Sequence, residues 1–219
     1  MFSFKRSKTQ KRLKICIGGD GGVGKTSYFK ALMGLNDTKY KHERNYNATP
    51  LNQYNLIILK IITESNGEII LDIWDTAGQE FKDGDLRDSF LANADGAIIL
   101  YDIQNAQTRH NVNNWLDRIR KICNETIPAV IVGNKMDKAK NNRENIIREC
   151  RFTSLTNIKT MLFSVRQRNN YSNPTKKGIN QVLDPIELLL QMYLNDKYLV
   201  IKDTEVINSQ LVSVYYFIK

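Results

Sequence analysis

The stretch that decides the fold is "GDGGVGKTSY", Gly19–Tyr28, which follows a short apolar run, "LKICIG", from Leu13. An apolar run that ends in glycines is typical of a buried strand, and the sequence predicts a helix from Lys25 to about Leu32. The loop between them fits the pattern G-x-x-x-x-G-K-[ST]. Glycines let such a loop curl its backbone N–H groups around phosphate oxygens, at the positive end of the following helix. The stretch therefore predicts a phosphate-binding unit of strand, loop and helix.

Individual residues of this loop have distinct expected roles. The Lys25 amine is expected to meet the β and γ phosphates of a nucleotide, and the Thr26 hydroxyl is expected to ligate Mg²⁺. The neighbouring residues that we expect to contact the nucleotide are Gly21, Gly22, Val23, Gly24 and Ser27.

Outside this unit, apolar runs alternate with helical patterns. The expected strands are "LIILKIIT" (56–63) and "EIILDIW" (68–74), joined by "ESNG" as a hairpin, then "GAIILYD" from 96, "PAVIVGN" from 128 and "MLFS" from 161. The expected later helices are "NVNNWLDRIRKIC" from 111 and "DPIELLLQMYL", with Asp184 as N-cap and Pro185 at the first helical position. This order predicts an α/β fold: a mostly parallel sheet with one antiparallel edge strand and helices on both faces. Ligands of such sheets bind at the carboxyl ends of the strands.

Length and composition limit the number of domains and the class of protein. The 219 residues, 42% of them hydrophobic, suffice for one core, or one domain plus a tail. Cys16, Cys123 and Cys150 are too scattered for a disulfide framework, and with only two histidines a zinc cluster is not expected, so an intracellular protein is the natural interpretation. No apolar run is long enough to span a membrane.

The net charge of +9 is concentrated at the start of the chain. Six basic residues and no acidic one fall in "MFSFKRSKTQKRLK", and the remainder is only mildly basic, so we expect no specific nucleic-acid binding. We interpret residues 1–11 as a basic disordered arm; the alternative is a nuclear-import or anionic-surface contact. At the other end, "LVSVYYFIK" must either pack back on the domain or meet a partner.

A second motif, "LDIWDTAGQE", follows another predicted strand. Asp75 ends that strand, where its carboxylate can hold a Mg²⁺-bound water. The Gly78 N–H can approach the terminal phosphate, and Gln79 can orient an attacking water. The alternative is a simple turn, since Asp, Thr and Gly favour turns in any case.

A third motif, "VGNKMD", presents Asn134, Lys135 and Asp137 at the same edge of the sheet. The Asp137 carboxylate can accept hydrogen bonds from the ring N–H and the exocyclic amine of guanine, a pair of donors that adenine lacks. Because a wrong base would leave this carboxylate unpaired, the motif favours GTP over ATP.

Together these motifs resemble the Ras-like small GTPases from about Arg12 to Ile201. The resemblance implies a six-stranded sheet with five helices, binding of GTP and GDP with Mg²⁺, and a change of shape on hydrolysis. We accordingly divide the chain into the arm, a GTPase domain at 12–195 and a C-terminal extension at 196–219.

Within that superfamily the sequence looks most like the Ran branch. The stretches that carry this resemblance are "GDGGVGKTSY", "YNAT", "WDTAGQE", "LRD", "NVNNW", "GNKMD" and "DPIELLLQMYLNDKYLVI". No cysteine follows Cys150, so we expect no prenyl anchor, unlike in most Ras, Rho and Rab relatives.

Two elements depart from the family pattern. In "YNAT", the resemblance implies that Thr49 ligates Mg²⁺ and that Tyr46 closes over the phosphates, but Pro50 follows where the family has an aliphatic residue and then glycine. The base-binding Ser-Ala-Lys of the family becomes Ser164, Val165 and Arg166. The resemblance implies that the middle residue, Val165, meets the guanine oxygen through its backbone N–H.

The resemblance implies a small monomeric GTPase that hydrolyses GTP slowly and depends on an exchange factor and a GTPase-activating protein. A Ran-like protein would bind nuclear transport receptors and move between cytoplasm and nucleus. Two alternatives remain: an unprenylated Rab-like trafficking GTPase, and a mimic of Ran that binds nucleotide without cycling.

Overall fold

The computed structural model describes residues 11–35, 53–76, 88, 90–139, 157–166, 169–170 and 179–213. The predictions made for Tyr46, Thr49, Gly78 and Gln79 lie outside these residues.

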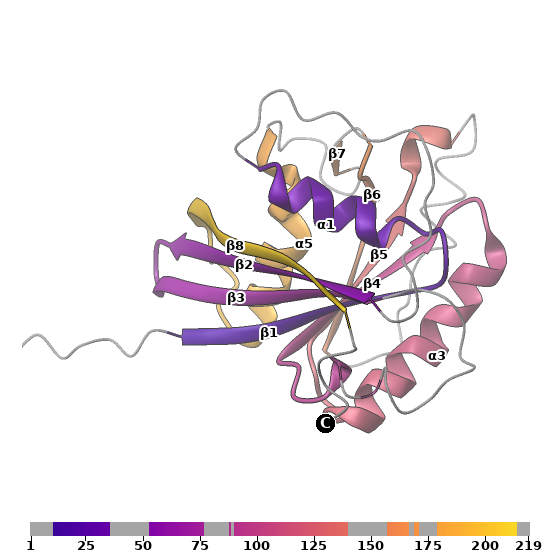
Figure 1. Ribbon diagram of the computed structural model, residues 1–219, viewed down its shortest axis with the longest axis horizontal. Helices are drawn as coiled ribbons and strands as arrows, with labels where there is room; N and C mark the ends of the chain where they lie inside the picture. Colours follow the sequence, from indigo (N-terminus) through magenta and orange to yellow (C-terminus); the bar gives the residue numbers. More distant parts are fainter. Residues whose placement is uncertain are drawn as a thin grey trace, which may run out of the picture.

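An eight-stranded sheet forms the centre of the protein, in the order β7-β6-β5-β4-β1-β3-β2-β8 (Figure 1). The strands are β1 Lys11–Gly18, β2 Gln53–Thr63, β3 Gly67–Thr76, β4 Gly96–Asp102, β5 Ala129–Asn134, β6 Ile158–Ser164, β7 Asn169–Asn170 and β8 Ile201–Ser213. Strand β1 pairs in parallel with β3 and β4, and β5 pairs in parallel with β4 and β6. The carboxyl ends of β1, β3, β4, β5 and β6 therefore share one edge of the sheet.

Helices cover both faces of the sheet. The α-helices whose bounds the described residues give are α1 Lys25–Met33, α3 Ala106–Ile122 and α5 Asp184–Tyr193, and the 3₁₀ helices are η1 Met136–Lys138 and η2 Ile179–Leu183. Figure 1 shows α1 and α5 on one side and α3 on the other. Successive side chains of β1 point to opposite faces of the sheet. Ile15 and Ile17 therefore lie in the core beneath α1 and α5, whereas Cys16 lies in the core beneath α3.

The predicted α/β fold is confirmed, but the strand count is not. Six strands were expected with the hairpin strand at the edge, whereas the described residues form eight and β2 lies inside the sheet, between β3 and β8. The sequences of the additional strands, β7 and β8, lack the alternation of apolar and polar residues that would have predicted them. Both pair antiparallel to their neighbours, so the sheet has more antiparallel pairings than expected.

Several predicted boundaries also need correction. Lys11, assigned to the disordered arm, lies in β1 opposite Ile69. Helix α3 begins earlier than predicted, because the Asn105 side chain caps it by accepting from the Gln107 N–H at 3.1 Å. Asp184 is the first residue of α5 and not its N-cap, because η2 already makes the chain helical as far as Leu183.

Strand β8 accounts for most of the C-terminal extension. It pairs antiparallel with the whole of β2, from Gln53 opposite Ser213 to Thr63 opposite Ile201. Val206 and Ile201 pack against the core beneath α1 and α5. The extension thus packs back on the domain as far as Ser213. None of the helices in the described ranges has both the length and the apolar character that crossing a membrane requires.

Candidate functional site

The glycine loop, residues 19–24, joins β1 to α1 in a conformation that only glycine tolerates well. Gly19, Gly22 and Gly24 have φ values of 130°, 74° and 105°. A Cβ atom on Gly19 would lie 2.2 Å from the Leu100 carbonyl oxygen, and one on Gly24 would lie 2.4 Å from Asn134 Nδ2. The loop is therefore pressed against β4 and β5 at Gly19 and Gly24, where an added side chain would collide.

Lys25 begins α1 and reaches back across the glycine loop. Its side chain is buried, and Nζ donates hydrogen bonds to the carbonyl oxygens of Gly19 at 2.8 Å and Asp20 at 2.7 Å. The loop thus holds a buried positive charge beside the N-terminus of a helix. Both features attract an anion, so this part of the structure fits the phosphate groups of a nucleotide.

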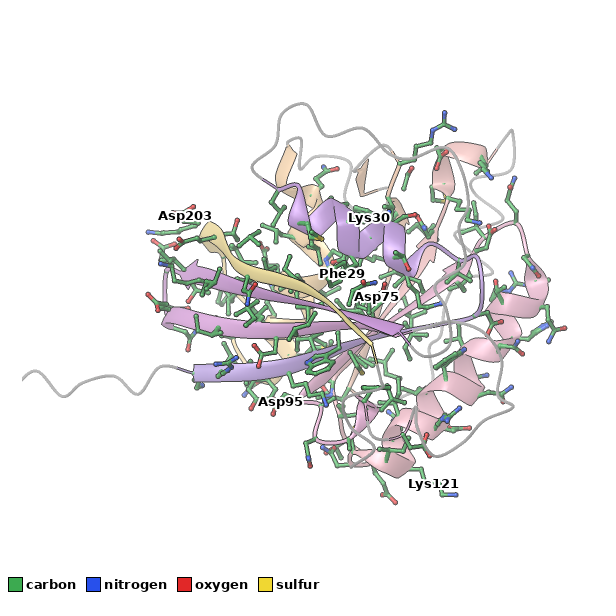
Figure 2. The ribbon with its side chains drawn as sticks, viewed as in Figure 1. Phe29, Lys30, Asp75, Asp95, Lys121 and Asp203 are labelled. Atoms are coloured by element: carbon green, nitrogen blue, oxygen red, sulfur yellow. The ribbon has the colours of Figure 1, made fainter. Side chains whose placement is uncertain are left out.

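Asp75 ends β3 and is fully buried between α1 and the sheet (Figure 2). Its Oδ2 atom accepts a hydrogen bond from Asn55 Nδ2 at 2.9 Å, while Oδ1 has no hydrogen-bond partner among the described residues. Burial raises the pKa of Asp75, and the hydrogen bond from Asn55, the charge of Lys25 and the Thr26 hydroxyl lower it in part. A buried carboxylate oxygen without a partner, near a hydroxyl, suits a hard cation such as Mg²⁺.

Asn134, at the end of β5, ties together the loops that flank the site. Its Nδ2 atom donates to the Val23 carbonyl oxygen at 2.9 Å, and its Oδ1 atom accepts from the Val165 N–H at 3.0 Å. The Val165 N–H, which was expected to meet the guanine oxygen, donates to Asn134 in this structure. Arg166, the next residue, is exposed.

Lys135 and Asp137 follow Asn134 and are also held by neighbouring elements. Lys135 has a left-handed backbone (φ 70°), and its Nζ atom donates to the Gly22 carbonyl oxygen at 2.8 Å and to Asp102 Oδ2 at 2.7 Å. The Ser164 hydroxyl donates to Asp137 Oδ1 at 2.6 Å. Because Asp137 remains partly exposed, its carboxylate is fixed by Ser164 but accessible at the edge of the sheet.

The structure thus brings the predicted residues of the glycine loop, β3, β5 and β6 to one edge. Asn134 links the loop at Val23 to Val165, and Lys135 links the loop at Gly22 to β4. When bound at Thr26 and Asp75, Mg²⁺ would neutralise charge on the phosphate oxygens. The protein groups would hold the nucleotide at both ends, with Lys25 at the phosphates and Asp137 at the base.

A further residue of the loop, Asp20, has a role that the loop motif did not reveal. Its carboxylate accepts hydrogen bonds from Asn111 Nδ2 at 2.7 Å and Trp115 Nε1 at 2.8 Å, both on α3. The Trp115 ring also lies under Gly18, where a Cβ atom would come within 3.3 Å of it. The signal available in the sequence was the four-residue spacing of Asn111 and Trp115, which places both on one face of a helix.

Asn55 and Asp102 are two further polar residues that the motifs did not indicate. Each contacts a predicted site residue from a neighbouring strand: Asn55 on β2 contacts Asp75, and Asp102 on β4 contacts Lys135. These contacts depend on strand register, which short motifs do not contain.

Comparison with models of known protein families gives a match to the Ras family over residues 14–184. The match covers most of the chain and includes the glycine loop, Asp75, Asn134, Asp137 and the residues after β6. Ras-family proteins are switches that bind guanine nucleotides with Mg²⁺ and hydrolyse GTP. On the length of this match, and with the site geometry that accompanies it, the chain belongs to the Ras family of small GTPases.

Proposed function

We propose that this chain is a Ran-like guanine-nucleotide switch that acts in nucleocytoplasmic transport. The observation that carries the proposal is the contact between Asp20 on the glycine loop and the two side chains Asn111 and Trp115 on α3. These residues come from "GDGGVGKTSY" and "NVNNW", two of the stretches on which the resemblance to Ran depends. Their hydrogen bonds join the phosphate-binding loop to a helix on the opposite face of the sheet.

In the proposed cycle, residues of this chain bind and hydrolyse GTP as in the Ras family. The glycine loop, Lys25 and Thr26 would hold the phosphates and Mg²⁺, with Asp75 behind the ion, and Asp137 would select guanine. Thr49 and Gln79 complete the proposal from the sequence motifs, Thr49 as a second metal ligand and Gln79 as the residue that orients the attacking water.

A switch that hydrolyses GTP slowly needs partner proteins to complete its cycle. An exchange factor would release GDP, a GTPase-activating protein would complete the hydrolytic site, and nuclear transport receptors would bind the GTP form. We propose that the protein acts as a monomer in cytoplasm and nucleus.

A capture experiment tests the choice between Ran-like and Rab-like function. The full chain, loaded with GDP or with a non-hydrolysable GTP analogue, is used to capture proteins from a nuclear and a membrane fraction. Selective capture of transport receptors by the GTP-analogue form is the expected result. Selective capture of membrane effectors would favour a Rab-like protein instead. An Asp137→Ala variant, which loses the guanine-binding carboxylate, is the control that should capture neither.

Hydrolysis is tested separately by single-turnover measurement on GTP-loaded protein. Wild type should convert GTP to GDP slowly, and Gln79→Leu should leave GTP bound, because leucine cannot orient water. Equal rates in wild type and variant would remove Gln79 from the mechanism. Absence of hydrolysis in wild type, with and without an activating protein, would favour a non-cycling mimic.

A further inference from the structure

The side chain of Asn55 lies against the buried carboxylate that ends β3. Asn55 is directly opposite Asp75 in the antiparallel β2–β3 pair, so the two side chains are on the same face of the sheet. Its Nδ2 atom donates to Asp75 Oδ2 at 2.9 Å. No short motif of the glycine loop or of "WDTAGQE" includes Asn55, which lies twenty residues before Asp75 in the sequence.

This hydrogen bond separates the two oxygens of the carboxylate. Oδ2 is engaged by the amide, whereas Oδ1 is buried and has no hydrogen-bond partner within the described part of the chain. Fixing one oxygen of a carboxylate fixes the direction of the other. The hydrogen bond from Asn55 therefore helps to fix where the remaining lone pairs of Asp75 point.

The chemical type of the partner matters as well. A lysine or arginine in place of Asn55 would neutralise the carboxylate and repel a cation. The amide donates a hydrogen bond but carries no charge, so Asp75 keeps its negative charge for an ion. Hydrogen-bond partners of this kind, one step behind a metal ligand, commonly contribute 10-fold to 100-fold to metal affinity.

The backbone beneath Asn55 is held from both sides. It lies opposite Asp75 on β3 and opposite Leu211 on β8, so its Cα position is fixed within the sheet and not at an edge. A positioning group needs such support, because its own orientation must be fixed before it can orient another group.

We propose that Asn55 is a positioning residue that orients the Asp75 carboxylate toward the Mg²⁺ ion of the nucleotide site. The inference rests on the proposed function in one respect, namely that the site holds Mg²⁺ with a guanine nucleotide. Asn55 acts through Asp75 and contacts neither the ion nor the nucleotide.

The test compares Asn55→Leu with a matched control on the same hairpin. Asn66, in the turn between β2 and β3, makes the same kind of bond far from the site: its Nδ2 atom donates to Asp196 Oδ2 at 3.0 Å. Asn66→Leu therefore removes an equivalent amide–carboxylate hydrogen bond without touching Asp75. Asn55→Val, which suits a strand and has no hydrogen-bond donor in its side chain, serves as a second variant if leucine prevents folding.

The measurement is the release rate of fluorescent GDP from the full chain over a series of Mg²⁺ concentrations and in EDTA. We expect Asn55→Leu and Asn55→Val to need about 10-fold to 100-fold more Mg²⁺ than wild type to slow release by half. In EDTA all variants should release GDP at the same rate, and Asn66→Leu should match wild type throughout. The affinity of the GDP-loaded proteins for Mn²⁺, measured by electron paramagnetic resonance, should fall by a similar factor.

Two results would overturn the inference: an unchanged Mg²⁺ requirement in the Asn55 variants, or faster release by one factor at every Mg²⁺ concentration. The second result would mean that Asn55 supports the fold or the nucleotide and not the ion. If wild type itself shows no Mg²⁺-dependent retention of GDP, the proposed function fails instead.

Discussion

Two regions of the sheet are held together by different means. The rim, defined here as residues 19–24, 134–137 and 164–165, depends on side chains that each bind two elements. Asn134 alone joins the glycine loop to Val165. Strand β8 depends instead on a continuous backbone ladder to β2, with ion pairs such as Lys60–Glu205 on its surface. A single side-chain substitution should therefore lower the free energy of unfolding more in the rim than in β8.

The largest expected effect is that of Gly19→Ala in the rim. The new Cβ would meet the Leu100 carbonyl oxygen at 2.2 Å, and alanine would be strained at φ 130°. Steric overlap and backbone strain each cost about 1–3 kcal/mol, so we expect a loss of about 2–5 kcal/mol in the free energy of unfolding, measured with urea.

Gly96→Ala is the control for that substitution. The three atoms nearest to its Cβ would all belong to the Leu189 side chain, the closest at 2.9 Å, and a side chain shifts at lower cost than a backbone carbonyl. A loss for Gly96→Ala as large as that for Gly19→Ala would show that the rim is no more tightly built than the rest of the sheet.

Lys25→Met should give the next largest effect, on binding and not on the fold. The amine is the positive charge at the centre of the glycine loop, and a hydrogen bond to a charged group contributes about 1.5–3 kcal/mol. We expect the Kd for GDP to rise by about 10-fold to 100-fold, measured by fluorescence titration. Lys121→Met, at the end of α3 (Figure 2), should leave the Kd unchanged. A similar loss in both variants would assign the effect to overall charge.

The same contrast explains what the sequence could predict. The rim is encoded by local motifs: glycines at fixed spacing before Lys25, and Asp75 and Asn134 at the ends of apolar runs. Those patterns are sufficient to predict which strand ends meet. They do not contain strand register or side-chain hydrogen bonds, so Asn55, Asp20 and the bond between Val165 and Asn134 were not foreseen.

Strand β8 could not be predicted for a different reason. Its sequence, "IKDTEVINSQLVS", mixes polar and apolar residues without a clear period of two, partly because the ladder to β2 has register shifts near Ile58 and Thr63. A shift of one residue moves the following side chains to the other face, which erases the alternation that identifies a strand. Pairing of β8 is decided by the free edge of β2, a property of the folded sheet.

Val206→Asp tests whether β8 contributes to the core. Val206 packs against the core beneath α1 and α5, whereas its neighbour Ile207 is 52% exposed. Placing a charge at the partly buried position should lower the free energy of unfolding by about 1–3 kcal/mol, and Ile207→Asp should change it by at most about 0.5 kcal/mol. Equal effects in the two urea titrations would mean that β8 rests on the domain without a buried face.

Asp75→Asn should produce a smaller effect whose size depends on pH. In nucleotide-free protein in EDTA, burial raises the pKa of Asp75 above its value in the unfolded chain, so ionisation opposes folding. Wild type should therefore lose stability, relative to Asp75→Asn, as the pH rises above the ordinary carboxyl range, and this difference should disappear below about pH 4. Urea titrations from pH 4 to 8 measure it. A difference that stays constant with pH would mean that Asp75 acts there by shape and not by charge.

Glu205→Gln should have the smallest effect and gives the strictest test of how β8 is held. The Glu205 side chain is 60% exposed, so its ion pair with Lys60 is screened by water and is worth about 0–1 kcal/mol. Since the backbone ladder from Gln53 to Thr63 is untouched, we expect the free energy of unfolding to change by less than about 0.5 kcal/mol at 0.1 M salt and by less still at 1 M. A loss well above 1 kcal/mol that vanishes in high salt would mean that side-chain charges hold β8 in place. The contrast with the rim would then have to be abandoned, because both regions would depend on a few polar contacts.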